Sequence, residues 1–164
     1  MNDYGQGTRF PLRPRGTALE DRVQIDAPAD VVWEVLADVD GWGRWNPVYP
    51  EAKGSVGVGD EIALTIVLEG MKPAKSSAKV FHSKPGEALQ FGALAFAGLV
   101  RATRFIEIAP SSPTSCTVVN GEAFGRLLGP TLVRMVGAKI QNGLRGQNAG
   151  LKAAAEAKWQ ARTG

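Results

Sequence analysis

The stretch of residues 25–47, IDAPADVVWEVLADVDGWGRWNP, constrains the fold of this chain more than any other part of the sequence. Ala27-Pro28 marks a helix start, because proline at the first helical position lacks only an N–H that would have had no partner there. Apolar residues then follow at helical spacing, namely Val32, Val35, Leu36 and Val39. Asp40-Gly41 ends the pattern. The stretch predicts the end of a strand, a short amphipathic helix over 28–39 and a tryptophan-rich turn over 41–46.

The rest of the chain alternates in the manner of β-strands until a long helical pattern begins after Pro130. Strands are predicted over residues 19–26, 48–53, 60–68, 72–82, 88–96, 99–109 and 116–124, and a helix over 131–159. Short links between successive strands favour an antiparallel meander over βαβ units. The long helix has one apolar and one polar stripe, which is typical of a helix lying on a sheet.

These patterns resemble the helix-grip (START-like) superfamily, and within it the polyketide cyclase/dehydrase and lipid-transport group. The matching residues are Ile25, Ala27, Pro28, Val32, Trp33, Trp42, Trp45, Asn46 and Pro47, with a second match at Asn120, Glu122, Phe124 and Gly125. The resemblance spans roughly residues 19–160. It implies an α+β helix-grip fold, in which a curved antiparallel β-sheet wraps around a long C-terminal α-helix, with two short helices after the first strand.

The length of 164 residues fits one domain, which we expect over residues 19–160, after a flexible basic tail over 1–18. No apolar run approaches the roughly 20 residues needed to span a bilayer, and the N-terminus lacks the apolar core of a secretory signal. The single cysteine, Cys116, excludes an internal disulfide and fits a reducing compartment. We therefore expect a cytoplasmic protein.

Charge is unevenly distributed although the net charge is only +3. Residues 130–164 carry six lysines and arginines against the single carboxylate of Glu156. The helix lacks the aromatic interleaving that nucleic-acid binding would add to such charge, so no nucleic-acid partner is expected. A solvated outer face explains the charge. A docking surface for an acidic protein or an anionic membrane, or a homodimer, remains the alternative.

The sequence offers little support for several kinds of enzyme. His82 is the only histidine, and there is no Gly-x-Ser-x-Gly nucleophile motif. No cluster of Cys and His has the spacing of a zinc site, so we expect no metal. Neither a dinucleotide fingerprint nor a phosphate-binding loop is present, so we expect no cofactor.

The resemblance implies a ligand cavity between the sheet and the long helix. The candidate ligand-binding residues are Trp45, Phe91, Phe105, Asn120, Glu122, Phe124, Met135 and Val136. We expect Val118, Asn120, Glu122 and Phe124 to face inward, and Thr103 and Phe105 to do so from the neighbouring strand. Four glycines of the long helix, Gly137, Gly143, Gly146 and Gly150, indicate either close backbone packing or room for a ligand.

Glu122 is the candidate catalytic residue, because a carboxylate among apolar neighbours is costly unless it is paired. Arg101, Arg104 and Lys139 are its possible partners. Glu122 could form a structural ion pair, accept an indole N–H of the Trp42–Trp45 turn, orient a ligand or act as a general acid or base. The related branch often has histidine where this chain has Asn120, and asparagine cannot shuttle a proton near neutral pH.

Three functions follow from these observations. The first is binding or carriage of a small hydrophobic molecule such as a lipid, a polyketide or an aromatic metabolite. The second, implied by the resemblance, is an enzyme like the polyketide cyclases, aromatases and dehydratases. The third is an assembly or interaction factor that docks through the basic C-terminal helix. At least two polar groups with shifted pKa values converging in the cavity would favour the second function. A dry cavity with one or two polar groups at its mouth would favour the first, and a filled core with a large exposed apolar or basic patch would favour the third.

Overall fold

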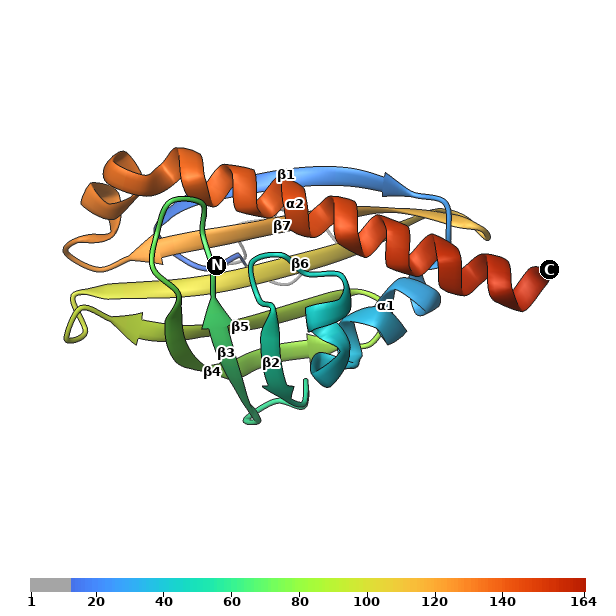
Figure 1. Ribbon diagram of the computed structural model, residues 1–164, viewed down its shortest axis with the longest axis horizontal. Coiled ribbons are helices and arrows are strands. Elements are labelled where there is room, and N and C mark those ends of the chain that lie inside the picture. Colours follow the sequence, from blue (N-terminus) through green and yellow to red (C-terminus); the bar gives the residue numbers. More distant parts are fainter. Residues whose placement is uncertain (1–12) are drawn as a thin grey trace.

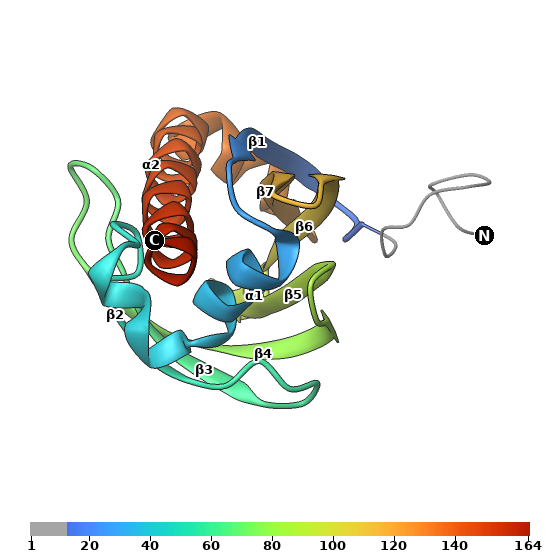
Figure 2. The same cartoon turned by 90° about the vertical axis from the view of Figure 1, so that its right-hand side faces the viewer.

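The fold of this chain is known from a computed structural model, which describes residues 13–164. Its elements are β1 (Thr17–Ile25), α1 (Ala29–Ala37), the 3-10 helix η1 (Val39–Arg44), β2 (Glu51–Gly54), β3 (Glu61–Ile66), β4 (Ala74–Lys84), β5 (Ala88–Ala95), β6 (Val100–Ser112), β7 (Ser115–Gly125) and α2 (Gly129–Thr163). The seven strands form one antiparallel sheet in the order β1-β7-β6-β5-β4-β3-β2. The sheet curves around α2, which lies along its concave side (Figures 1 and 2). The expected helix-grip fold is confirmed.

The boundaries of the predicted elements need small changes. β1 begins at Thr17, two residues before the expected start of the domain, and the expected tail over 1–18 lies mostly outside the described residues. Arg13 already belongs to the fold, because its guanidinium forms an ion pair with Glu107 at 2.9 Å. Both short helices after the first strand are present, the second as η1.

The main core lies under α1, between η1, the sheet and the C-terminal half of α2 (Figure 2). Trp42 is its largest fully buried side chain, and its indole Nε1 donates to the carbonyl of Leu36 at 2.9 Å. Tyr49 stacks on Trp42 with ring centroids 5.9 Å apart. A second apolar cluster lies under the first half of α2 and includes Phe124 and Ile140. The space between these two clusters contains the candidate site.

The register of β6 and β7 decides which side chains face α2. Arg104 pairs directly with Glu122, whereas Thr103 pairs with Ala123 and Phe105 with Gly121. Since directly paired residues share one face of a sheet, Thr103 and Phe105 lie on the opposite face from Glu122. The prediction that they face inward is therefore wrong. The ring of Phe105 instead fills the space above Gly121, and the Arg13 guanidinium lies 5.0 Å from its centroid.

The glycines of α2 allow close packing against the segment after η1. A Cβ built on Gly150 would lie 1.9 Å from the backbone oxygen of Trp45, so the helix could not approach this segment with a side chain there. At Gly146 the nearest atom is Cγ of Pro47, at 3.2 Å. Gly143 also lines the cavity described below. Close packing therefore explains Gly150, and both sequence-based interpretations apply to Gly143.

Candidate functional site

An apolar cavity of about 190 Å³ lies beneath the first half of α2. Its lining comes from the segment after η1, four strands, the β3–β4 loop and one side of α2, and comprises Val48, Tyr49, Ile66, Leu68, Met71, Ala95, Ala102, Arg104, Glu122, Phe124, Leu132, Val136, Ile140 and Gly143. Ten of these fourteen residues have apolar side chains, so the walls favour an apolar occupant. Polar atoms come from Tyr49, Arg104 and Glu122.

These polar groups belong to a buried network centred on the guanidinium of Arg104. Its Nη2 donates to the Tyr49 hydroxyl at 3.0 Å and to Oε2 of Glu122 at 3.0 Å. Its Nη1 donates to Oδ1 of Asn120 at 3.2 Å and to Oε1 of Gln147. Arg104 is almost fully buried, and the Glu122 side chain is 17% exposed. The network ties β6 and β7 to α2 at the inner wall of the cavity.

Asn46 extends this network into the turn after η1. Its Oδ1 accepts hydrogen bonds from Nε2 of Gln147 at 3.0 Å and from the backbone N–H groups of Val48 and Tyr49. The turn is therefore held by an amide network and not by Glu122, and the interpretation that Glu122 accepts an indole N–H from it is wrong. One buried donor is left over, since Nε of Arg104 has no hydrogen-bond partner among the described residues.

Burial and neighbouring charge fix the protonation states of two groups in the network. Burial raises the pKa of Tyr49 to about 12, against the opposing attraction of the Arg104 cation. Burial on its own would lower the pKa of Arg104, but the Glu122 carboxylate and Tyr49 outweigh it and raise that pKa above its ordinary value. At neutral pH the cavity wall therefore presents a phenol and a permanent cation.

Comparison with known proteins places this architecture in a family. The family model for polyketide cyclase/dehydrase and lipid transport proteins matches residues 17–156. The chain belongs to this family. No curated protein sequence matches the chain.

Solved structures share its fold at low sequence identity. The Zhui aromatase/cyclase from Streptomyces sp. R1128 is 20% identical with a TM-score of 0.75, over 90% of this chain and 98% of that chain. A di-domain aromatase/cyclase from the BE-7585A biosynthetic pathway is 19% identical with a TM-score of 0.69, over 85% of this chain and 46% of that chain. Norcoclaurine synthase from Thalictrum flavum is 17% identical with a TM-score of 0.64, over 84% of each chain. Identities this low establish the fold, while activity has to be argued from the site.

The structure gathers some of the predicted residues of this family member at the cavity and places others elsewhere. Glu122, Phe124 and Val136 line it, as predicted. Trp45, Phe91 and Asn120 lie deeper, around a residual space of about 10 Å³ that is too small for a ligand. Met135 is 75% exposed and does not line the cavity, and Phe105 lies on the other face of the sheet. These two positions correct the expected lining.

Of the three possible partners of Glu122, the structure selects Arg104. Arg101 lies on the outer face of the sheet, and Nζ of Lys139 donates to the backbone oxygen of Glu69. Sequence reasoning missed the role of Gln147, which joins the network from α2. Its position was nevertheless a signal, because Gln147 interrupts the apolar stripe of the helix at a buried position.

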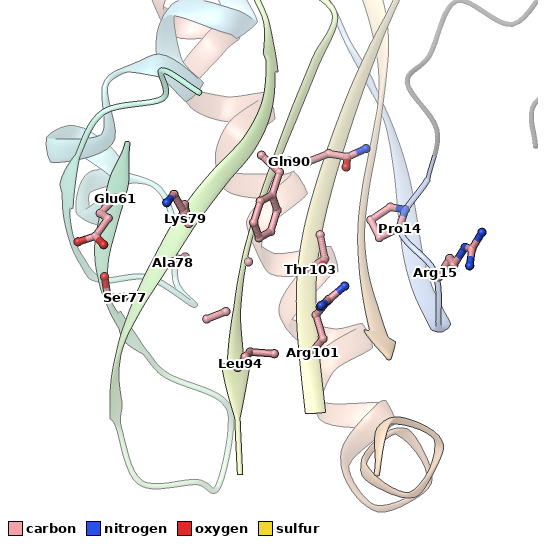
Figure 3. A pocket seen from close by; sticks show the side chains of 13 residues that line it. Pro14, Arg15, Glu61, Ser77, Ala78, Lys79, Gln90, Leu94, Arg101 and Thr103 are labelled. Carbon is pink, nitrogen blue, oxygen red and sulfur yellow. The ribbon is translucent and has the colours of Figure 1, made fainter. Parts of the chain in front are cut away.

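A wider groove of about 720 Å³ crosses the opposite, outer face of the sheet (Figure 3). Arg15, Lys79 and Arg101 line it together with Leu94, and Gln90 and Thr103 form part of its floor. The larger volume reflects a more open depression, and the Arg104 network lies on the other side of the sheet. We therefore take the less open cavity under α2 as the candidate site.

Three further observations concern residues 13–164. Within residues 13–164, no group of three or more His, Cys, Asp and Glu side chains is arranged to hold a metal ion. His82 pairs with Gln90 between β4 and β5, outside the cavity lining, so the only histidine of the chain takes no part in the site. In the same part of the chain, no helix is long and apolar enough to cross a membrane.

Proposed function

We propose that this protein binds a small, mainly apolar molecule in the cavity between the sheet and α2. The observation that carries the proposal is the combination of apolar walls with one polar corner formed by Arg104, Tyr49 and Glu122. Burial of apolar surface would supply most of the binding free energy, at about 25 cal/mol per Å². The polar corner would orient the molecule.

The polar corner favours a ligand that carries an acceptor oxygen. Arg104 and Tyr49 bring N–H and O–H groups to the lining of the cavity. A carbonyl or hydroxyl oxygen of the ligand would accept a hydrogen bond from one of these groups. The Arg104 cation also favours an oxygen with negative character.

The size of the cavity limits the ligand to a compact molecule. At about 190 Å³ it is smaller than the roughly 300–1,000 Å³ typical of drug-sized ligands. It exceeds the roughly 150 Å³ of an engineered apolar cavity that holds one benzene ring. We therefore infer a ligand of one or two rings, and a longer chain would require α2 or the β3–β4 loop to move.

The test compares two phenylalanine substitutions at neighbouring positions of α2. Val136→Phe places a ring in the cavity, whereas Met135→Phe adds a ring at an exposed site and serves as the matched control. Binding of β-naphthol and of naphthalene is measured by isothermal titration calorimetry. We expect wild type and Met135→Phe to bind β-naphthol with equal affinity, and both to bind naphthalene more weakly. Val136→Phe should bind β-naphthol at least about tenfold more weakly than wild type does, a loss of about 1.4 kcal/mol. Equal binding by both variants, or no binding by wild type, would contradict the proposal.

A second candidate function is catalysis on a carbonyl compound, favoured by the convergence of Tyr49 and Arg104 on one cavity wall. A phenol that keeps its proton and a fixed cation suit the stabilisation of an enolate oxygen. The test is exchange of the α-hydrogens of an aryl β-diketone for deuterium, followed by NMR. Faster exchange with wild type than with Tyr49→Phe supports catalysis, and equal rates leave binding as the function.

A further inference from the structure

A cluster of exposed apolar side chains forms one end of the molecule, and we refer to it as the apolar tip. It consists of Met71, Phe96, Leu99, Leu127, Leu128 and Met135. Leu127 is 78% exposed and Met135 75% exposed. Single exposed apolar residues are ordinary on protein surfaces, but a contiguous group of them marks an interaction surface.

Hydrogen bonds join the segments that carry the apolar tip. The β5–β6 turn meets the β7–α2 loop, where the backbone N–H of Leu128 donates to the carbonyl of Leu99 at 3.0 Å. The β3–β4 loop, which carries Met71, meets α2 where Nζ of Lys139 donates to the carbonyl of Glu69 at 2.8 Å. The β5–β6 turn, the β7–α2 loop and the first turns of α2 lie together at the same end of the molecule (Figure 1).

The backbone of the apolar tip is strained in a way that stability alone would not select. Phe96, Ala97 and Arg126 have φ angles of 51°, 53° and 69°. Such left-handed conformations favour glycine, asparagine or aspartate, and a strained residue costs of order 1 kcal/mol or more. A turn chosen for stability would carry one of those residues where this chain has the exposed Phe96.

Basic residues surround the apolar tip and lack acidic partners. They are Lys72, Arg101, Arg126, Arg134 and Lys139, against the single carboxylate of Glu69 in the same segments. None of the five lies within ion-pair distance of a carboxylate among residues 13–164. Farther along α2, in contrast, Arg145, Lys152, Lys158 and Arg162 each face a carboxylate. The segments of the apolar tip therefore carry five cationic side chains without a carboxylate partner among residues 13–164, as many as lie elsewhere in that part of the chain, at Arg15, Arg22, Lys53, Lys75 and Lys79.

The apolar tip adjoins the ligand cavity. Met71 lines the cavity and is 45% exposed. Ala95 also lines it and comes directly before Phe96 in the sequence. Leu132 lines it from α2, one helical turn before Met135. An apolar molecule that left the cavity past Met71 would therefore meet apolar side chains at the surface. The same surface would shield that molecule from water if the apolar tip were inserted in a lipid phase.

We propose that the apolar tip docks on the surface of a bilayer that contains anionic lipids. The apolar side chains come from a turn, two loops and the start of a helix, which suits insertion into the headgroup and acyl boundary. Each nearby lysine or arginine adds about 1 kcal/mol of attraction to an anionic leaflet. The surface is defined by contacts and charges of its own, so the inference does not depend on which molecule the cavity binds.

The test is co-sedimentation of the full chain with vesicles of phosphatidylcholine, with and without phosphatidylglycerol. We expect binding to the anionic vesicles, weakened by added salt because exposed charges are screened. Arg126→Glu/Arg134→Glu should lower the partition coefficient by at least about tenfold. Phe96→Ser/Leu127→Ser should also lower it while leaving the charge unchanged.

The matched control is Arg22→Glu/Lys53→Glu, which makes the same charge change at exposed residues that are outside the apolar tip and form no ion pair within residues 13–164. Circular dichroism shows that each variant is folded. Docking is overturned if wild type binds neither kind of vesicle, if it binds both alike, or if the control loses as much binding as Arg126→Glu/Arg134→Glu. It is also overturned if light scattering shows that Phe96→Ser/Leu127→Ser converts a dimer to a monomer, because the occupant would then be a second copy of the chain.

Discussion

Replacing Arg104 by methionine should be among the most destabilising single changes in this protein. The substitution keeps an unbranched side chain but removes the hydrogen bonds to Tyr49, Asn120, Gln147 and Glu122. It also leaves the Glu122 carboxylate, with a side chain only 17% exposed, without the cation 3.0 Å away. Breaking a buried pair by removing one partner costs about 3–5 kcal/mol, a large part of the 5–15 kcal/mol that stabilises a typical domain.

The reason for this cost can be isolated with a double-mutant cycle. If it comes from the stranded carboxylate, then Arg104→Met/Glu122→Leu should be more stable than Arg104→Met by about 2 kcal/mol or more, because the double variant buries no unpaired charge. Glu122→Leu alone should also be destabilising, since it leaves the Arg104 guanidinium without its counter-ion. The two single changes should therefore be strongly non-additive.

The assay is equilibrium unfolding in urea, followed by tryptophan fluorescence and analysed by linear extrapolation. Arg101→Met is the control, because Arg101 lies on the same strand but on the outer face and has no ion pair among the described residues. It should change the free energy of unfolding by no more than about 0.5 kcal/mol. Additivity of Arg104→Met and Glu122→Leu within about 0.5 kcal/mol would refute the reasoning.

Two other features of the fold give predictions. Burial raises the pKa of Tyr49 to about 12 in the folded protein, against about 10 in the unfolded chain. The neutral phenol therefore contributes about 2–3 kcal/mol to the free energy of unfolding below pH ~10, and this contribution is lost as the pH rises through ~12. Urea unfolding at a series of alkaline pH values should show a larger loss for Tyr4→Phe than for Tyr4→Phe/Tyr49→Phe, because the buried Cys116 thiol, whose pKa burial raises to about 11, contributes a loss in both. Equal losses would contradict the prediction. Gly150→Ala should be destabilising in spite of the better helix propensity of alanine, because its Cβ would lie 1.9 Å from the backbone oxygen of Trp45. Gly137→Ala, where the nearest atom is 3.4 Å away, should raise the unfolding free energy by up to about 1 kcal/mol, and thermal melts compare the two.

Periodicity predicted best those elements of this fold that are exposed on one side. The α2 stripe that includes Ile140, Leu144 and Leu151 is buried as expected, and β3 buries Ile62 and Leu64. Alternation of apolar and polar residues in such elements directly reports which side faces the core. The tryptophan-rich turn was predicted from a different signal, because Pro, Gly and Asn residues mark its ends.

The face of β6 could not be obtained in this way. Both faces of that strand are covered, with Ile106 under the helices and Phe105 under Arg13 on the outer side, so an apolar residue does not identify the inner face. The pairing with β7 then decides which residues of β6 face α2. The register of this pairing shifts at an irregularity between Pro110 and Ser112, close to the turn that joins the two strands. A shift of one residue exchanges every side chain between the faces of a strand. The prediction that Met135 lines the cavity is wrong for another reason. Met135 comes one residue before Val136, so its side chain points about 100° away from that of Val136 around the helix axis.

The proposed ligand binding would give the protein a reason to keep the buried Arg104–Glu122 pair that stability does not give. Apolar residues of similar volume often replace a buried ion pair without loss of stability, so the fold alone gives weak reason to keep it. The folded Arg104→Met/Glu122→Leu variant can therefore test the role of the polar corner directly. If Arg104 holds the oxygen of the ligand, this variant should bind naphthalene at least as well as wild type does but lose the preference for β-naphthol. If the preference survives, another donor such as the Tyr49 hydroxyl orients the ligand, and Arg104 has no part in its recognition.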